Sequence, residues 1–194
     1  MHFQAGYAYH LFNRSNEILF RERENYHFFI RKIKKNILPV SDIIAWCLLP
    51  NHFHLMLLVK PAGALFVEEK HRPHTQILSK KIGTLLSSYT LAFNKKYKRK
   101  GSLFAHRTRA KVLNTGGNEY PEICFNYIHQ NPRISGYVEK AETWEYSSYR
   151  AFADGFDDGL VNKAIAREVI IFNRDHFREW SEIMLDEKLL NYNI

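Results

Sequence analysis

The fold is decided by one stretch, Pro50-Asn51-His52-Phe53-His54-Leu55-Met56-Leu57-Leu58-Val59. Its apolar second half predicts a β-strand. Because successive side chains on a strand alternate between the two faces, His52 and His54 share one face while Phe53 turns to the other. The apolar run 43–49 leads into the Pro-Asn turn signal, which predicts an antiparallel hairpin. We expect this hairpin to lie at the centre of the sheet.

Two histidines on one strand face are a candidate metal site. Neutral imidazole is the commonest protein metal ligand, and a pair held on a rigid strand can converge on one divalent cation. The alternative is that His52 and His54 are only the polar face of a half-buried strand, which is the more frequent origin of a His-x-His pattern. A third ligand from elsewhere in the chain is needed to decide between the two.

A second block supplies that ligand type, Tyr127-Ile128-His129-Gln130-Asn131-Pro132. Pro121 suits the first turn of a helix, no breaker follows until Pro132, and Pro132 sets the predicted end. Residues four apart share a helix face, so Tyr127 and Asn131 face the same neighbour. If that neighbour is the histidine strand, the Asn131 amide oxygen completes a three-ligand site beside a tyrosine hydroxyl. A packed core aromatic is the alternative for Tyr127.

The remaining periodicities predict one α+β domain of the ferredoxin-like kind, with a mainly antiparallel sheet and helices packed on it. The expected order is strand 7–13, helix 23–37, strands 43–49 and 52–59, a long helix from 77 into the 95–100 run, strand 103–113 and helix 120–130. We assign residues 1–152 to this domain. Residues 153–194, helical from 161 to 188, form a C-terminal appendage. Its Phe172, Phe177 and Trp180 could cover the site or bind DNA, but aromatic spacing of this kind is usually packing, so we expect them to dock on the core.

The charge balance favours a polyanionic partner. The chain has 194 residues, with 28 Lys and Arg against 20 Asp and Glu, a net charge of +8 and a pI of about 9.4. Nucleic acid is therefore the first candidate partner.

No apolar run approaches the ~18 residues that span a bilayer, and the N-terminus lacks a signal-peptide pattern, so we expect a cytoplasmic protein without a membrane partner. Cys47 and Cys124 are expected to be buried free thiols.

The strongest electrostatic signal lies between Asn94 and Lys111. Eight Lys or Arg residues occur there with no acid among them. A helix C-terminus by itself favours Lys and Arg, which accounts for part of the run. Its continuation beyond Gly101 through Arg107 and Arg109 has no such explanation and indicates contact with a phosphate backbone.

The predicted site suits phosphoryl chemistry. A hard divalent ion such as Mg²⁺ or Mn²⁺, bound with incomplete protein coordination, can take phosphate oxygens in its open positions. The oxygen of Tyr127 is then the nucleophile, and it needs help from the cation or a nearby Lys or Arg because a phenol ionises near pH 10. A phosphotyrosine keeps a reactive ester, so a DNA 3′ hydroxyl can reverse the attack and rejoin strands. Holding several strand ends suggests a homodimer.

These blocks together resemble a known family. The motifs are Tyr9-His10-Leu11-Phe12-Asn13-Arg14, Leu49-Pro50-Asn51-His52-Phe53-His54-Leu55, Tyr127-Ile128-His129-Gln130-Asn131-Pro132 and Trp144-Glu145-Tyr146-Ser147-Ser148-Tyr149. In this order they resemble the single-tyrosine HUH transposases of bacterial insertion sequences, closest to the REP-associated tyrosine transposase branch. The resemblance covers about residues 5–152.

The resemblance implies a metal-dependent enzyme that nicks single-stranded DNA next to small hairpins through a 5′-phosphotyrosine intermediate and then rejoins strands. By position it makes His52 and His54 metal ligands, Tyr127 the nucleophile and Asn131 the third ligand, where insertion-sequence relatives often have glutamine. The residues it implies as DNA contacts are Arg14, Lys95, Lys96, Lys98, Arg99, Lys100 and Arg107. The alternatives are a catalytically idle, domesticated DNA-hairpin-binding protein and a phosphodiesterase that uses water.

Overall fold

A computed structural model describes the chain except for residues 16, 69–73, 105–106, 114–119, 172–174 and 189–194. Its centre is a four-stranded sheet in the order β2-β3-β1-β4, with every neighbouring pair antiparallel. The strands are β1 (Ala8–Arg14), β2 (Ser41–Leu49), β3 (His52–Val59) and β4 (Arg109–Val112). The predicted hairpin of β2 and β3 is present, and β3 lies inside the sheet.

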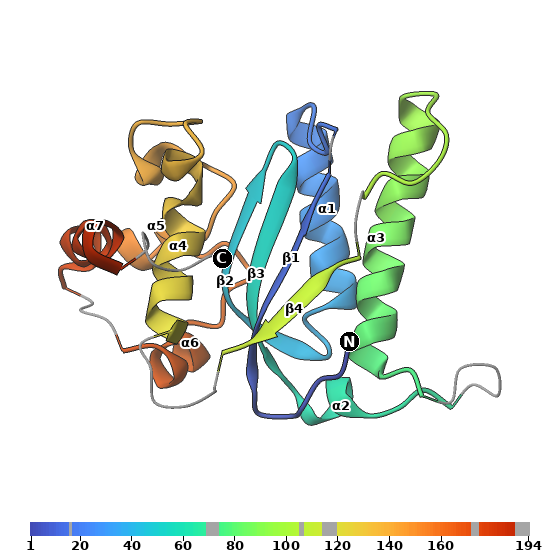
Figure 1. The fold of residues 1–194 in the computed structure, drawn as a ribbon, viewed down its shortest axis with the longest axis horizontal. Coiled ribbons are helices and arrows are strands. Elements are labelled where there is room, and N and C mark those ends of the chain that lie inside the picture. Colours follow the sequence, from blue (N-terminus) through green and yellow to red (C-terminus); the bar gives the residue numbers. More distant parts are fainter. Residues whose placement is uncertain (16, 69–73, 105–106, 114–119, 172–174, 189–194) are drawn as a thin grey trace.

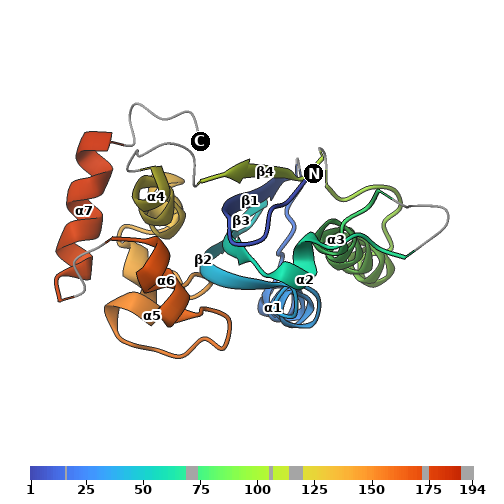
Figure 2. The same cartoon turned by 90° about the horizontal axis from the view of Figure 1, so that it is seen from below.

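Helices cover both faces of this sheet. One face carries α1 (Arg23–Asn36) and α3 (Ile77–Lys96), and α4 (Tyr120–Ile134) lies on the other, as Figures 1 and 2 show. The order β1-α1-β2-β3-α3-β4 with this strand arrangement is the ferredoxin-like βαββαβ pattern, so the predicted fold class is confirmed. The short α2 (Pro61–Ala64) follows β3, where the sequence predicted only the end of the hairpin.

The side chains of β3 alternate between the two faces of the sheet and so contribute to two separate hydrophobic clusters. Phe53, Leu55 and Leu57 pack with residues of α1 and α3 in one cluster. Met56 packs with residues of α4 in the other. His52 and His54 have the same parity as Met56 and therefore face the α4 side. The polar pair thus stands on the face that also receives the tyrosine helix.

The C-terminal region covers the outer edge of β2. Its elements are a 3₁₀ turn (Ala141–Thr143), α5 (Tyr149–Ala153), α6 (Lys163–Val169) and α7 (Phe177–Lys188). Single bridges join Cys47 to Ser147 and Ile43 to Val161, so the free edge of β2 is partly paired. Phe177 is buried against α4 as expected for docking, and Trp180 packs beside it, while Phe172 lies outside the described residues.

Three predicted boundaries were wrong. The strand expected at 103–113 is only the four residues of β4. The helix expected from 161 to 188 is two helices, because Ile170 leaves the helical region. The third error is at Pro132, which lies inside α4 instead of ending it. That helix ends at Ile134, and just beyond it Gly136 takes φ +73° while Tyr137 N–H donates to the Pro132 carbonyl, a glycine C-cap arrangement.

Gly63 allows a close approach of backbone segments. A Cβ at this position would lie 2.4 Å from the Val40 carbonyl oxygen, whereas one at Gly83 in α3 would meet nothing within 4 Å. We expect Gly63→Ala to lower the free energy of unfolding by about 1–3 kcal/mol. Gly83→Ala, in a helix interior, should raise it by about 0.5–1 kcal/mol. Urea denaturation of both variants checks the pair, and an equal effect at the two positions would contradict the packing.

Among the described residues, no helix is both long enough and apolar enough to cross a membrane.

Candidate active site

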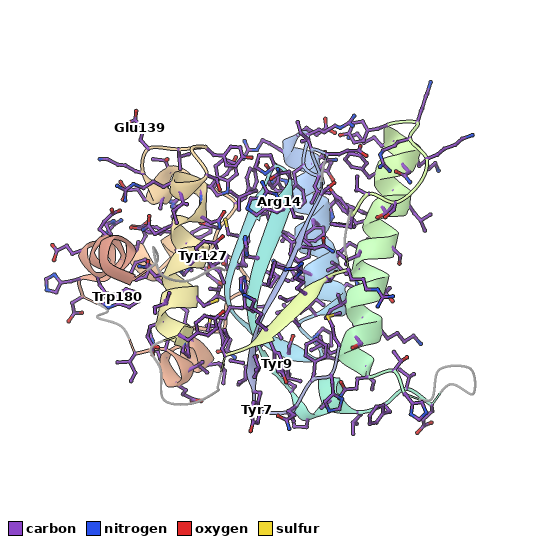
Figure 3. All side chains as sticks on the ribbon, in the orientation of Figure 1. Tyr7, Tyr9, Arg14, Tyr127, Glu139 and Trp180 are labelled. Carbon is purple, nitrogen blue, oxygen red and sulfur yellow. The ribbon has the colours of Figure 1, made fainter. Side chains whose placement is uncertain are left out.

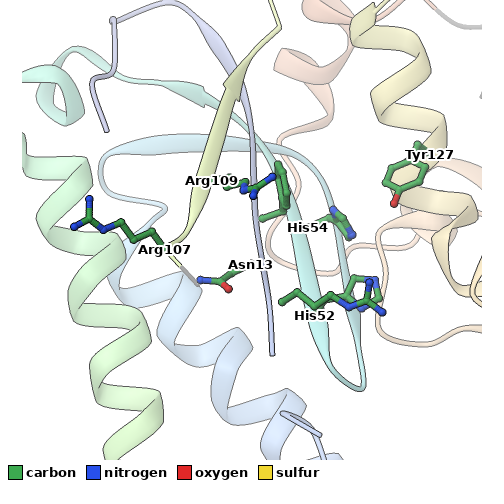
Figure 4. A pocket seen from close by; sticks show the side chains of 8 residues that line it. Asn13, His52, His54, Arg107, Arg109 and Tyr127 are labelled. Carbon is green, nitrogen blue, oxygen red and sulfur yellow. The ribbon is translucent and has the colours of Figure 1, made fainter. Parts of the chain in front are cut away.

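A pocket of about 260 Å³ opens on the α4 side of the sheet (Figure 4). Its lining comes from the ends of β1 and β3, from the start of β4 and the segment before it, and from α4: Phe12, Asn13, Arg14, His52, His54, Arg107, Arg109 and Tyr127. Strand register explains this gathering. Arg14 pairs with His52, and Phe12 pairs with both His54 and Arg109, so these side chains form adjacent rows across the sheet.

The two histidines and Asn131 come together as the sequence predicted. Nε2 of His52 lies 3.0 Å from Oδ1 of Asn131, and Nε2 of His54 lies 3.4 Å from Nδ2 of the same amide. The two imidazole ring centroids are 5.2 Å apart. Because α4 runs on past Pro132, Asn131 is held in a regular helical turn. Three side chains from two elements therefore converge on one point.

Tyr127 stands beside this group. Its ring is half-buried on α4, perpendicular to the His54 ring and 5.4 Å from it between centroids. Figure 3 shows Tyr127 on the α4 side of the sheet, and Figure 4 shows it facing the strand that carries His52 and His54. Burial raises the pKa of the Tyr127 hydroxyl, and a hydrogen bond with Asn131 and the charge of Arg14 act in the opposite direction. An additional charge is therefore needed to ionise it near neutral pH.

Burial favours the uncharged form of both histidines. Burial lowers the pKa of His52, and it lowers the pKa of His54 well below the usual range. The charge of Arg14 acts in the same direction on both. A neutral imidazole keeps one lone pair, which is the form that binds metals.

Sequence reasoning did not assign His10 to the site. It lies on β1 with no exposed surface, and its Nε2 is 2.8 Å from Nδ1 of His54. Burial, helped by the charge of Lys111, lowers its pKa to about 3. The signal available in the sequence was the parity of β1, since His10 alternates onto the same face as Phe12 and Arg14.

The donor set fits a hard divalent ion with open coordination positions. The described residues contain no cluster of three or more His, Cys, Asp or Glu side chains arranged for a metal. The third donor beside the two imidazoles would be the Asn131 amide oxygen, a ligand type that Mg²⁺ and Mn²⁺ accept. The set leaves room for phosphate oxygens.

The basic residues divide into pocket and peripheral groups. Arg14, Arg107 and Arg109 are exposed and line the pocket, with Arg107 extending toward α3 in Figure 4. Among the peripheral group, Lys96 pairs with Glu22, and Arg99 pairs with Glu17 while donating to the Gly101 and Ser102 carbonyls. Lys95, Lys98 and Lys100 are exposed around the C-terminal end of α3. The structure thus gives Arg99 a role in holding a loop, beside its predicted contact with DNA.

Other tyrosine and histidine side chains that could serve as nucleophile or ligand are engaged elsewhere. Tyr89 is buried and donates to the Leu19 carbonyl, and Tyr97 donates to Glu22 and Asn25. Tyr149 is buried in the cluster beneath α4. His129 is a core residue on a different face of α4 from Tyr127, and its Nε2 lies 2.7 Å from the Ser148 hydroxyl oxygen. His106 lies outside the described residues. Both cysteines are free and buried, as predicted.

No protein-family model and no curated protein matches the chain significantly. A solved structure of a REP-associated tyrosine transposase bound to a REP hairpin does match, with a TM-score of 0.57 and 16% sequence identity. The match covers 90% of this chain and 93% of that one. The likeness therefore extends over most of the length of both chains. The chain has the fold of a REP-associated tyrosine transposase.

Proposed function

We propose that this protein is a transposase-type enzyme that nicks and rejoins single-stranded DNA beside small hairpins through a 5′-phosphotyrosine intermediate. The observation that carries the proposal is the convergence of His52, His54 and Asn131 beside Tyr127 in one arginine-lined pocket. The fold shared with a transposase that binds a hairpin supports the same reading.

Tyr127 carries the covalent step. Its hydroxyl oxygen bonds to the phosphorus of a backbone phosphodiester and gives up its proton, while the bond to the 3′ oxygen breaks and that oxygen leaves as a 3′ hydroxyl. The 5′ phosphate stays on the tyrosine, so the ester can be reversed by another 3′ hydroxyl. Arg14 faces the group from the end of β1 and favours the phenolate by its charge.

His52, His54 and Asn131 would hold Mg²⁺ or Mn²⁺, which when bound polarises the phosphate and helps to ionise the tyrosine. The protein contributes a fixed donor geometry, because β3 is an interior strand and α4 packs on it. Since Tyr127 lies beside histidines of its own chain, we propose that the reaction takes place within one protomer. The homodimer stays a prediction, which light scattering of the purified protein would test.

The arginines offer a path for the DNA strand. A second cavity of about 530 Å³ runs along α3 and shares Asn13 and Arg107 with the catalytic pocket. Its remaining lining is made of small, hydroxyl-bearing and apolar side chains. Helix α3 contains four lysines and no acid. A single strand that leaves the pocket past Arg107 would meet a surface without negative charge on this helix.

We expect Arg107→Ala and Arg109→Ala to weaken binding of single-stranded hairpin DNA. The logarithm of the binding constant falls as the logarithm of the salt concentration rises. Each lost phosphate contact should make this negative slope less steep by about 0.7. Fluorescence anisotropy across a salt series measures this, with Arg167→Ala on α6, an exposed arginine outside the pocket, as the matched control. Unchanged slopes in both pocket variants would contradict the assigned path.

The covalent intermediate is the direct test of the proposal. The protein is incubated with labelled single-stranded hairpin DNA and Mg²⁺ or Mn²⁺, and the products are run on a denaturing gel. We expect a labelled protein–DNA band that disappears when the metal is chelated. Tight hairpin binding without any cleavage, across a range of hairpin sequences, would instead favour the idle DNA-binding protein.

A further inference from the structure

His10 is a buried histidine whose position is set by strand register. It pairs with Met56 across β1 and β3, so His54 is its diagonal neighbour on the same face. The two rings are nearly coplanar, with an interplanar angle of 22° and centroids 5.1 Å apart. Nε2 of His10 therefore points at Nδ1 of His54 across 2.8 Å, a normal hydrogen-bond length.

Only one proton can lie between these two nitrogens, and the other side of His54 decides where it comes from. Nε2 of His54 faces Nδ2 of Asn131, which can only donate. A neutral His54 that accepts at Nε2 must carry its own proton on Nδ1. That proton then points at His10, whose Nε2 must be the acceptor. The same tautomer leaves on Nε2 of His54 the lone pair that a metal ligand requires.

We propose that His10 is a positioning residue, whose Nε2 accepts the Nδ1–H of His54 and so holds the His54 Nε2 lone pair toward Asn131 and the pocket. The inference rests on the proposed function only for what that lone pair binds. Histidine ligands generally donate their second N–H to a carboxylate, a carbonyl or water. Here the acceptor is a neutral imidazole, which orients the ring without adding negative charge beside an incoming phosphate.

The surroundings of His10 hold it in this role. Its ring stacks on Phe12 with centroids 4.7 Å apart, so it cannot turn away from His54 without losing that contact. Among the described residues its Nδ1 has no hydrogen-bond partner. Leaving a buried polar atom unsatisfied costs about 1–3 kcal/mol. A core position that needed only volume would be filled at lower cost by leucine, so the retained imidazole points to its Nε2 contact.

The tautomer of His54 is the decisive measurement. Long-range ¹H–¹⁵N correlation spectra of the metal-free full chain, labelled with ¹⁵N-histidine, report which ring nitrogen carries the proton. Comparison with His54→Gln assigns the His54 signals. We expect His54 to be protonated at Nδ1 and His10 to be unprotonated at Nε2. A His54 ring protonated at Nε2 would overturn the inference, with no assumption about metal or catalysis.

Two substitutions then test the effect on the ligand. His10→Leu keeps the volume and removes the acceptor, whereas the side-chain oxygen of His10→Gln can still accept from Nδ1 of His54. We expect Mn²⁺ titrated by calorimetry to bind His10→Leu about 10- to 100-fold more weakly than wild type, and His10→Gln to recover most of the loss. Wild-type affinity in a folded His10→Leu would overturn the inference. If His10→Leu does not fold, the His54 tautomer in wild type and the Mn²⁺ affinity of His10→Gln still test the inference.

Failure of this inference and failure of the proposed function are separable. If wild type forms the covalent DNA band while His54 is protonated at Nε2, the function stands and His10 has no positioning role. If His54 has the Nδ1–H tautomer but wild type binds no Mn²⁺ and forms no band, His10 positions His54 and the metal-dependent function is wrong.

Discussion

Replacing Tyr127 with phenylalanine should abolish the covalent protein–DNA band and lower strand cleavage by at least about 10³-fold. The substitution removes one oxygen, the atom that would bond to phosphorus. The ring remains, so its perpendicular contact with His54 and its packing against the hydrophobic cluster between α4 and the sheet are kept. DNA affinity and thermal stability should therefore change little, since a half-buried hydroxyl contributes about 1 kcal/mol or less. A denaturing gel and anisotropy on the same preparation separate these effects.

Tyr137→Phe is the matched control, because Tyr137 is an exposed tyrosine just after α4 that packs on Trp144 and lies outside the pocket. It should form the covalent band as wild type does. If Tyr127→Phe still cleaves DNA and neither protein forms an adduct, water is the nucleophile and the chain is a phosphodiesterase. If the adduct persists in Tyr127→Phe, another tyrosine attacks, and the pocket is not the site of the covalent step.

The local part of the fold could be predicted because it depends on neighbours in sequence. Alternation on β3 placed both histidines on one face, and the i, i+4 spacing placed Tyr127 and Asn131 together on α4. The one serious local error was Pro132. Proline disfavours the helical region in the residue before it, yet α4 continues for two residues beyond Pro132, to Ile134. The left-handed conformation of Gly136 and the hydrogen bond from Tyr137 N–H to the Pro132 carbonyl then terminate it.

What escaped prediction depends on contacts between distant segments. Arg109 enters the pocket only because β4 pairs with β1 in a register that sets it opposite Phe12. His10 reaches His54 only through the diagonal of the β1–β3 pair. Arg99 looked like part of a continuous DNA-binding run, but Glu17, 82 positions away in sequence, draws it into an ion pair. Strand register and such pairings are properties of the assembled sheet and loops.

Removing either imidazole should destroy metal binding and with it the covalent reaction. We expect His54→Ala and His52→Ala each to raise the dissociation constant for Mn²⁺ by more than about 100-fold, because losing only an outer partner of a ligand costs about 10- to 100-fold. The two variants should differ in thermal stability. His54 is 5% exposed and held by His10, so His54→Ala also leaves an unpaired buried nitrogen on His10, whereas His52 is partly exposed.

Calorimetric titration with Mn²⁺, read beside thermal unfolding, measures both effects. His27→Ala is the control, since His27 is exposed on α1 on the opposite face of the sheet, and it should bind Mn²⁺ as wild type does. Asn131→Ala completes the set, because the amide faces Nε2 of both histidines and its loss should weaken Mn²⁺ binding without disturbing β3. Equal Mn²⁺ affinity in wild type and His52→Ala would mean that the pocket holds no ion between the imidazoles. The arginines alone would then have to stabilise the charge on the phosphate.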